Sequence, residues 1–470
     1  MIEDIGITMT APPNVYRQRR ARLAGSLGRP LVIFSGHAPG RNYATNPHQF
    51  RAGSSYLYFG GPPVENAAWL IEPGSDGESG CTLLRPPPGP DDALWIGEIP
   101  GDEHLAMAAG VPVGNLADAG KLDELVAGRA VAAVCPPHAE TLAWMARLGL
   151  AAADEDERRA IVGLRNIKDE YELNAMRRAA EVTLRAHRAA LAAAAPGRTE
   201  ADIAAAYSAE VIAAQCTYAF NPIITVRGEV LHTQGYPNKL NDRDLLLVDA
   251  GAEEPGGYAS DVTRTAPVNG QWTQIQRHLY ETAERALRTA TAACVPGKRY
   301  RDIHDLSARV ICEGLVEAEL LRGDPAELTA RVAHALFYPH GVGHLIGLDG
   351  HDMEDFGDVA GYAPGRTRRP EFGNKYVRLD RDLAAGMTVT IEPGIYLVPA
   401  IWASAELVGP FADAFNRSKV EALLADNFGG IRIEHTLCVR ESGGPEVLSA
   451  GLPTGADEVA ALVGARGVGG

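Results

Sequence analysis

The 470-residue sequence has no excess of basic residues and no long hydrophobic run. Its 44 lysines and arginines against 60 aspartates and glutamates give a formal net charge of −16, which argues against binding nucleic-acid phosphates or an anionic membrane surface. No apolar segment approaches the length of a membrane span, and the amino-terminal segment has acidic residues where a signal peptide needs basic ones. We therefore expect a cytoplasmic protein that binds neither nucleic acid nor membrane.

Cysteine is also scarce, and no two cysteines form a CxxC pair. The residues are scattered and mostly lie in apolar surroundings, as buried free thiols in a reducing compartment do. A disulfide framework is therefore not expected. The six cysteines are Cys81, Cys135, Cys216, Cys294, Cys312 and Cys438.

The length and the 46% apolar fraction favour two or three domains with substantial cores. Residues 1–155 alternate helical stretches with short β-type runs, which predicts an α/β domain. The runs are PLVIFSG, SSYLYFGG, AAWLIEPG, GCTLLRPPPGPDDALWIG and AVAAVCPP. The acidic, alanine-rich segment 151–161 is interpreted as a linker. A second domain over residues 160–470 then begins with a long amphipathic helix that stops at Pro196.

A weak internal repeat runs through the second domain. Pro196-Gly197 leads into Asp202-Ile203 and a helix, and Pro296-Gly297 leads into Asp302-Ile303 and another helix, 100 residues later. Strand-like segments follow each copy. Two short matches also arise by chance; if the repeat is real, the domain consists of two similar α+β halves related by a pseudo-twofold axis, with a cleft between them.

Four acidic residues lie at the ends of apolar, strand-like segments. Asp249 and Asp261 flank a turn whose β-hairpin would bring the two carboxylates together, and Glu392 and Glu434 each follow a short apolar run. Strand-end acids often point to solvent, but four buried carboxylates need cations or shared protons. With one imidazole they match a dinuclear site for Mn²⁺, Co²⁺ or Zn²⁺, which activates water for hydrolysis.

Three histidines, His340, His344 and His351, stand close together in PHGVGHLIGLDGHD. The segment HGVGH lacks the glutamate of an HExxH zinc helix, and Gly341 and Gly343 oppose a helix. The spacing alone leaves a metal site, a proton relay or no function open.

The ordered motifs VDAG…SDVTRT, HGVGHLIGLDGHD, TIEPGIY and GIRIEH resemble those of the pita-bread (M24) metallopeptidases, the family of methionine aminopeptidase, aminopeptidase P and prolidase. The first domain also resembles the creatinase-like α/β amino-terminal domain of aminopeptidase P and the longer prolidases, through YRQRRARL, RNYATNPHQFRAGSSYLYFGG and DDALWIGE. The resemblance implies an α/β amino-terminal domain followed by an α+β pita-bread catalytic domain with pseudo-twofold symmetry.

The same resemblance implies a role for each motif residue. Asp249 would bind one metal ion, Asp261 and Glu434 would bridge two, and His344 with Glu392 would complete the second. Glu392 would also shuttle a proton. The remaining implied residues contact the substrate or steer a ligand: His232, His340, His351 and Arg432, with His351 hydrogen-bonded to the scissile carbonyl.

The implied activity is that of an Xaa-Pro aminopeptidase, which hydrolyses the bond before proline with a hydroxide bridging two divalent ions, Mn²⁺ first and Zn²⁺ or Co²⁺ as alternatives. A prolidase is the alternative, because Arg378 falls near the position of a carboxylate-binding arginine; Arg378 is equally explained as a surface partner of Asp380 or Asp382. A non-catalytic peptide-binding protein is a third reading. Substrates are Xaa-Pro peptides or dipeptides, and the extra domain suggests a homodimer or homotetramer.

Two features depart from the family pattern. His435 follows Glu434 where an acidic residue is usual, and it either points away from the site or perturbs the orientation of Glu434. The polar, glycine-rich segment 354–376 is assigned no role.

Overall fold

The computed structural model describes residues 8–43, 45–97 and 100–465, and its chain divides into two compact units, 1–166 and 167–470. The acidic segment interpreted as a linker belongs to the first unit, as β6 (Ala151–Ala152) and most of α7 (Glu155–Arg165). Asp154 caps α7 by accepting from the amide of Glu157, whose side chain accepts from the amide of Asp154 in return. The acidic residues that suggested a linker are therefore the stabilised first turn of a helix.

The first unit is built on one mixed six-stranded sheet in the order β4-β3-β2-β1-β5-β6. Strands β1, β2 and β3 are antiparallel neighbours, and the outer pairs are parallel. The remaining strands and helices are β1 (Leu31–Phe34), β2 (Ala68–Ile71), β3 (Cys81–Arg85), β4 (Leu116–Asp118), β5 (Ala132–Val134), α1 (Pro13–Ala24), α2 (Ser54–Tyr58), α3 (Asp92–Ile96), α4 (Asp102–Ala109), α5 (Leu122–Val126) and α6 (Ala139–Arg147). This arrangement confirms the predicted α/β class.

One predicted strand is wrong: SSYLYFGG forms the single-turn helix α2. The helix begins after Gly53 and leaves Tyr56, Tyr58 and Phe59 all buried, although Tyr58 and Phe59 are consecutive. Successive residues of a strand point to opposite faces, so a strand with one face in solvent would expose either Tyr58 or Phe59. Tertiary packing has overridden the β propensity of these aromatic residues.

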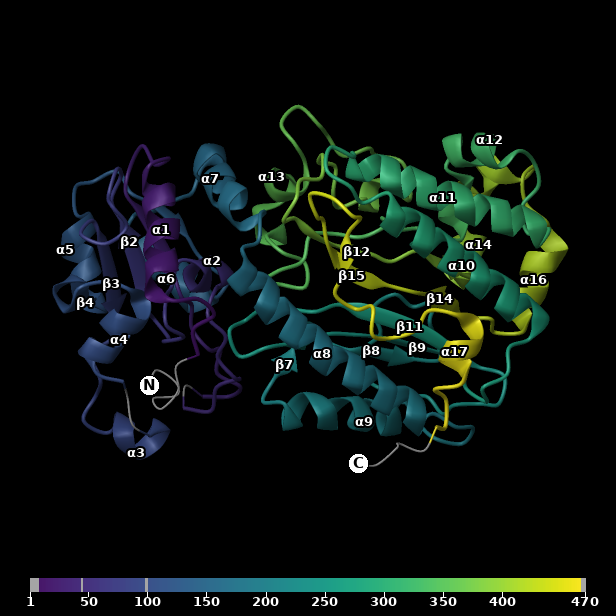
Figure 1. The fold of residues 1–470 in the computed structure, drawn as a ribbon, viewed down its shortest axis with the longest axis horizontal. Coiled ribbons are helices and arrows are strands. Elements are labelled where there is room, and N and C mark those ends of the chain that lie inside the picture. The colour runs from purple at the N-terminus through teal and green to yellow at the C-terminus, as the bar shows by residue number, and fades with distance from the viewer. Residues whose placement is uncertain (1–7, 44, 98–99, 466–470) are drawn as a thin grey trace. The chain divides into compact units, whose positions relative to one another are not determined.

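The second unit contains two long helix pairs and two three-stranded sheets (Figure 1). The helices are α8 (Glu170–Ala193), α9 (Glu200–Ala213), α10 (Gln274–Ala292), α11 (Tyr300–Glu317), α12 (Pro325–Ala330), α13 (Asp358–Gly361), α14 (Pro399–Ala403), α15 (Ala405–Val408), α16 (Arg417–Ala425) and α17 (Ala456–Ala460). The sheets have the orders β11-β9-β8 and β12-β15-β16, beside the pairs β13-β14 and β10-β7. None of the described helices is long and apolar enough to cross a membrane.

The strands of the second unit are β7 (Thr217–Tyr218), β8 (Ile223–Thr225), β9 (Leu245–Ala250), β10 (Ala252–Glu253), β11 (Val262–Pro267), β12 (Thr388–Ile391), β13 (Gly394–Tyr396), β14 (Gly430–Arg432), β15 (His435–Cys438) and β16 (Glu446–Val447). Strands β9 and β11 pair antiparallel with Asp249 opposite Thr263, which confirms the predicted hairpin. Asp249 lies within the buried central strand, and Asp261 directly precedes β11.

Backbone hydrogen bonds confirm the internal repeat. The amide of Gly197 donates to the carbonyl of Leu240, and the amide of Gly297 donates to that of Leu383. Both glycines open the segment before a helix, α9 in the first half and α11 in the second. The donors are 100 residues apart and the acceptors 143 apart. Asp249 and Glu392 differ by the same 143 positions, so they are equivalent residues of the two halves.

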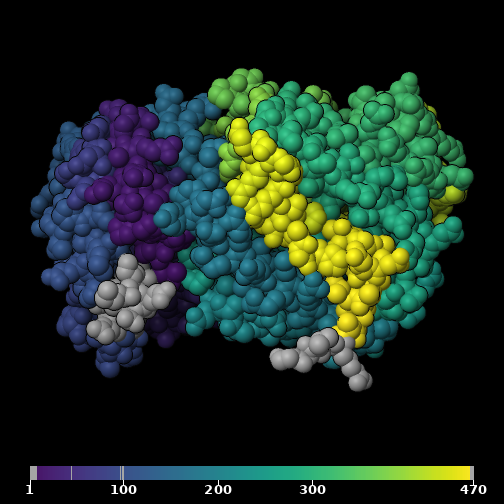
Figure 2. Space-filling model, in the orientation of Figure 1, coloured from purple at the N-terminus to yellow at the C-terminus, as the bar shows by residue number. Residues whose placement is uncertain are grey.

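The carboxy-terminal segment crosses one face of the second unit beside α8 and α10 (Figure 2). Arg177 in α8 bonds to Glu446, and Tyr280 in α10 donates to the carbonyl of Thr454. The buried guanidinium of Arg264 in β11 donates to the carbonyl oxygens of Leu452 and Pro453. These bonds fasten the segment to the two helix layers and to the hairpin that carries Asp261.

Candidate metal centre

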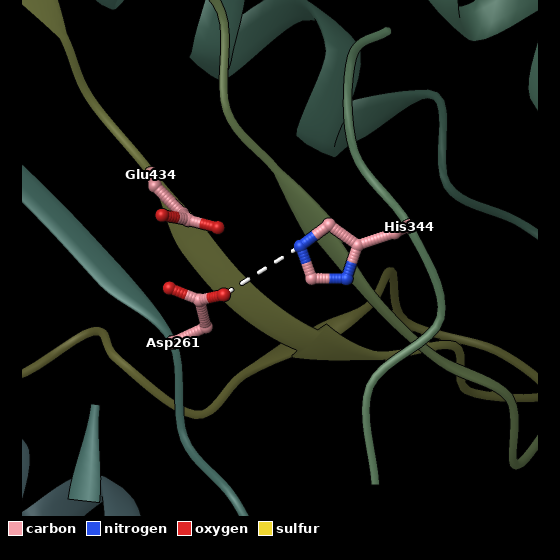
Figure 3. A group of neighbouring side chains, drawn as sticks. All are labelled: Asp261, His344 and Glu434. Carbon is pink, nitrogen blue, oxygen red and sulfur yellow. Dashed lines mark ion pairs between the residues drawn. The ribbon is translucent and has the colours of Figure 1, made fainter. Parts of the chain in front are cut away.

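Three buried side chains from distant parts of the chain converge in the second unit. Asp261, His344 and Glu434 each offer a ligand atom, and these atoms all lie within 4.8 Å of one another. Figure 3 shows the His344 ring facing both carboxylates, with its Nε2 3.5 Å from Asp261 Oδ2. Asp261 and Glu434 are the residues directly before β11 and β15, and His344 lies on a loop.

Two more carboxylates complete the group. Glu392, which directly follows β12, places Oε1 3.5 Å from Nε2 of His344. Asp249 lies on β9, the strand paired with β11, and its Oδ2 accepts from Nη2 of Arg432. The structure therefore brings together Asp261, Glu434, Glu392 and the single imidazole, with Asp249 on the neighbouring strand.

The electrostatics of these carboxylates call for a cation. Burial raises the pKa of Asp261 well above its usual value, and the charges of Asp249 and Glu392 raise it further. Burial also raises the pKa of Glu434, assisted by the charges of its three neighbours. Asp261 Oδ1 and Glu434 Oε1 are buried without a hydrogen-bond partner. Buried, unpartnered carboxylate oxygens facing one another fit a site for divalent cations.

His344 is oriented as a metal-binding histidine. Its Nδ1 lies 2.9 Å from the carbonyl oxygen of Leu345, a geometry that places the proton on Nδ1. The lone pair of Nε2 is then directed toward Asp261 and Glu392. Gly343 makes this approach possible, because a Cβ there would lie 2.2 Å from the carbonyl oxygen of Thr390. The loop is not a helix, as the glycines predicted.

A buried hydrogen-bonded chain connects Asp249 with His340. Arg432, bonded to Asp249, also donates from Nη1 to the hydroxyl of Tyr396 at 2.9 Å. That hydroxyl lies 2.9 Å from Nε2 of His340, whose Nδ1 lies 2.8 Å from the carbonyl of Gly341. Burial, with the charge of Arg432, lowers the pKa of His340 to about 3, so its ring is neutral. Both ring nitrogens of His340 are thus engaged within the protein.

Tyr396 is a residue that the sequence analysis missed. It lies on β13, four positions after Glu392, in the motif TIEPGIY. A Cβ on Gly394 would lie 2.3 Å from its hydroxyl, and a Cβ on Gly430 would lie 2.5 Å from its ring. The glycines of EPGIY and GGIRIE therefore make room for this ring, and they were the signal in the sequence.

The family model for metallopeptidase family M24 matches residues 174–441, and the model for the aminopeptidase P amino-terminal domain matches residues 16–130. The chain belongs to metallopeptidase family M24. This membership confirms the resemblance found in the motifs, and the paired domains confirm the predicted combination of an aminopeptidase P-like domain with a pita-bread domain.

Curated relatives and solved structures agree with the family assignment. A probable Xaa-Pro aminopeptidase PEPP of Ajellomyces capsulatus is 30% identical over 440 residues, covering 88% of each chain. Xaa-Pro aminopeptidase 1 of Streptomyces coelicolor is 29% identical over 456 residues, 94% of this chain and 85% of that protein. Aminopeptidase PepP of Pseudomonas aeruginosa superposes with a TM-score of 0.78 at 29% identity, covering 97% of this chain and 99% of that chain. Zinc-substituted Escherichia coli aminopeptidase P in complex with product gives a TM-score of 0.76 at 26% identity, with 96% and 98% coverage.

Two further predicted residues of this M24 chain lie beside the metal centre. The ring of His351 has its centroid 4.2 Å from that of His344, and its Nδ1 lies 3.3 Å from Glu354 Oε2. Glu354 also accepts two bonds from Nη1 of Arg378. The structure thus joins His351 and Arg378 through a glutamate that the sequence analysis left without a role.

Arg378 does not pair with either aspartate proposed as its surface partner. Asp380 pairs with Arg299 and Arg366, and Asp382 pairs with Arg366. This surface explanation of Arg378 is therefore wrong, because the flanking aspartates face other arginines.

His232 lies on an exposed loop of the M24 domain, between β8 and β9. Desolvation lowers the pKa of its imidazole, and the charge of Arg432 lowers it further. The buried carboxylate of Glu200 holds both ends of this loop, accepting from the amides of Val226 and Asn238. Glu200 is a second residue that the sequence analysis missed.

His435 points away from the metal centre. Its Nδ1 lies 2.7 Å from the hydroxyl of Ser449, and burial with the nearby charge of Arg264 lowers its pKa well below the usual value. Successive residues of an extended chain face opposite sides, so His435 and Glu434 diverge. Glu434 is instead oriented by Thr263, whose hydroxyl donates to Oε2 at 2.7 Å.

Proposed function

We propose that the chain is an Xaa-Pro aminopeptidase that uses two divalent metal ions to hydrolyse the bond between an amino-terminal residue and proline. The observation that carries this proposal is the convergence of Asp261, His344 and Glu434, with Glu392 and Asp249 beside them. The M24 family and the named Xaa-Pro aminopeptidases support the same activity.

The five predicted ligands fit a dinuclear site. Asp249 would hold one ion, Asp261 and Glu434 would bridge both, and His344 with Glu392 would hold the second. Four carboxylates balance the charge of two divalent ions, and the oxygen-rich set suits Mn²⁺, with Zn²⁺ or Co²⁺ as alternatives. When bound, such ions polarise the scissile carbonyl and lower the pKa of a water molecule. A zinc-substituted aminopeptidase P is among the similar structures.

The remaining side chains would bind the substrate and move protons. Glu392 has the most exposed of the clustered side chains, at 17%, so its Oε2 can take a proton from water and return it to the leaving amine. His351 would donate a hydrogen bond to the scissile carbonyl from Nε2 when its ring is protonated; burial lowers the pKa of the ring, and Glu354 at Nδ1 opposes that shift. Arg432 orients the Asp249 carboxylate.

The first experiment measures release of alanine from Ala-Pro-Ala after Mn²⁺ is added. Asp261→Ala is expected to abolish hydrolysis with little loss of folding, because it removes a bridging ligand from the interior. Asp426→Asn changes the charge equally at a side chain that is 60% exposed and should leave activity unchanged. Equal activity of wild type and Asp261→Ala would falsify the proposal.

A dipeptidase that cleaves only Xaa-Pro is the second candidate. Arg378 is the residue that favours it, because a guanidinium released from Glu354 can hold the free carboxylate of a dipeptide. Comparing Ala-Pro with Ala-Pro-Ala separates the two: efficient cleavage of the tripeptide identifies an aminopeptidase. A metal content near zero and no hydrolysis of either peptide would instead favour a non-catalytic peptide-binding protein.

The other expectations from the sequence remain part of this proposal. The net charge of −16 supports a protein that binds no nucleic acid and no membrane. A cytoplasmic location accords with its unpaired cysteines. A homodimer or homotetramer is proposed from the extra domain, and sedimentation of the purified protein tests it.

A further inference from the structure

Glu354 forms an ion pair with Arg378, a partly exposed cation near the metal centre. Nη1 of Arg378 donates to its two carboxylate oxygens at 2.7 and 2.6 Å, and Nδ1 of His351 lies 3.3 Å from Oε2. Within the part of the chain that the structure describes, Glu354 is the only ion-pair partner of Arg378. A carboxylate of the protein therefore holds the position that a substrate carboxylate would take.

This group of three is accessible to ligands. The side chains of Arg378 and Glu354 are 38% and 37% exposed, and that of His351 is 39% exposed. Burial opposes the charge of Glu354, but His351 and Arg378 outweigh it and lower the pKa of the carboxyl to about 2. The lowered pKa favours the charged form of Glu354, the form that pairs with Arg378.

The backbone is built to direct Glu354 at His351. Met353, which is fully buried, adopts a left-handed conformation with φ of 63°. A residue with a side chain rarely adopts this conformation without a local reason. The amide of Glu354 then donates to the carbonyl of His351, which closes a tight turn. The turn folds the glutamate back toward the histidine that precedes it by three positions.

We propose that Glu354 determines substrate length by competing with a free substrate carboxylate for Arg378, so that peptides longer than Xaa-Pro are favoured. This inference rests on the proposed function. A dipeptide carries its carboxylate directly after the proline ring and must displace Glu354 to reach the guanidinium. A longer peptide presents a neutral amide at that point and needs no exchange.

The test measures kcat and KM of the Mn²⁺-loaded enzyme for Ala-Pro and Ala-Pro-Ala. Glu354→Gln keeps the shape of the side chain and removes its charge. Relative to KM for Ala-Pro-Ala, it should lower KM for Ala-Pro roughly fivefold, the worth of one exposed ion pair, while any effect through His351 changes hydrolysis of both peptides alike. Adding Arg378→Gln should remove this gain. Glu319→Gln is the matched control, since it removes an equal charge from an exposed pair with Lys419.

Two results would overturn the inference. They are a ratio of KM for Ala-Pro to KM for Ala-Pro-Ala that is unchanged in Glu354→Gln, and a fall in this ratio that persists without Arg378. If the wild type hydrolyses neither peptide, the proposed function fails. Calorimetric titration of the metal-free protein with Ala-Pro and Ala-Pro-amide then tests the competition for Arg378 without catalysis. Glu354→Gln should then tighten binding of Ala-Pro alone, and equal tightening of both ligands would exclude competition for Arg378.

Discussion

Replacing Lys168 by methionine is expected to destabilise the second unit severely. Nζ of Lys168 lies 2.8 Å from Oδ2 of Asp352, and both side chains are only 1% exposed. Asp352 directly follows His351, and its amide donates to the carbonyl of Leu345, which closes the loop that carries His351. Gly347 permits the close approach, because a Cβ there would lie 2.5 Å from the Asp352 carboxylate.

The size of the effect follows from this burial. Lys168→Met removes the buried cation that bonds to Asp352, and breaking a buried ion pair costs about 3–5 kcal/mol of unfolding free energy. The double variant Lys168→Met, Asp352→Asn removes both charges and should recover more than half of that loss. Solvent screening does not reduce the effect, since neither side chain reaches water.

Urea unfolding of the metal-free protein measures these differences without stabilisation by a bound ion. Arg331→Met, which breaks the exposed pair with Asp413, is the control and should leave the midpoint unchanged. A loss below about 1 kcal/mol for Lys168→Met would refute the reasoning, because the buried ion pair would then contribute little to the free energy of unfolding. Additive losses in the double variant would refute it as well.

Three further outcomes are expected. Mn²⁺ at 100 times its dissociation constant should stabilise the wild type by about 2.7 kcal/mol in thermal unfolding, and an equal shift in Asp261→Ala would contradict the ligand assignment. Tyr396→Phe removes the hydroxyl that Arg432 bonds, which should cost about 1–3 kcal/mol in urea unfolding; a neutral result would mean that Arg432 finds another acceptor. The hydrogen bond from Arg177 lowers the pKa of Glu446 below its ordinary 4.5. This interaction therefore stabilises the fold by about 1 kcal/mol at pH 7, and the stabilisation is lost as the pH falls below 4.5. The unfolding free energies of wild type and Glu446→Gln should become equal in acid. A difference that persists at low pH would show that the substitution removes packing and not charge.

The hairpin and the repeat were predictable because their signals are local. Asp249 closes an apolar run, a turn follows, and Asp261 opens the next strand, so the pleat and the turn were enough to place two carboxylates together. The glycines at positions 197 and 297 marked the two equivalent helix starts.

Other features depend on partners far apart in the chain, which no local pattern encodes. Lys168 and Asp352 are separated by 184 positions, and neither lies in a segment whose periodicity marks it. The helix at SSYLYFGG contradicts the β propensity of its residues because the surrounding core decides where the aromatic rings lie. Glu354 lies in a segment that has no regular pattern, and only the left-handed turn at Met353 directs it to Arg378.

The repeat also determines when the metal centre can form during folding. Oε2 of Glu434 accepts from Thr263, 171 positions earlier, and the amide of Asp261 donates to Thr436, 175 positions later. Contacts between such distant residues form slowly, because a long loop must close before they contribute any stability. Each half supplies equivalent acids, so a nascent chain that has reached only Asp261 carries half of a centre. The chain would therefore gain its ability to bind metal only when the two halves dock. The rate of metal uptake during refolding can then report the rate of that late folding step.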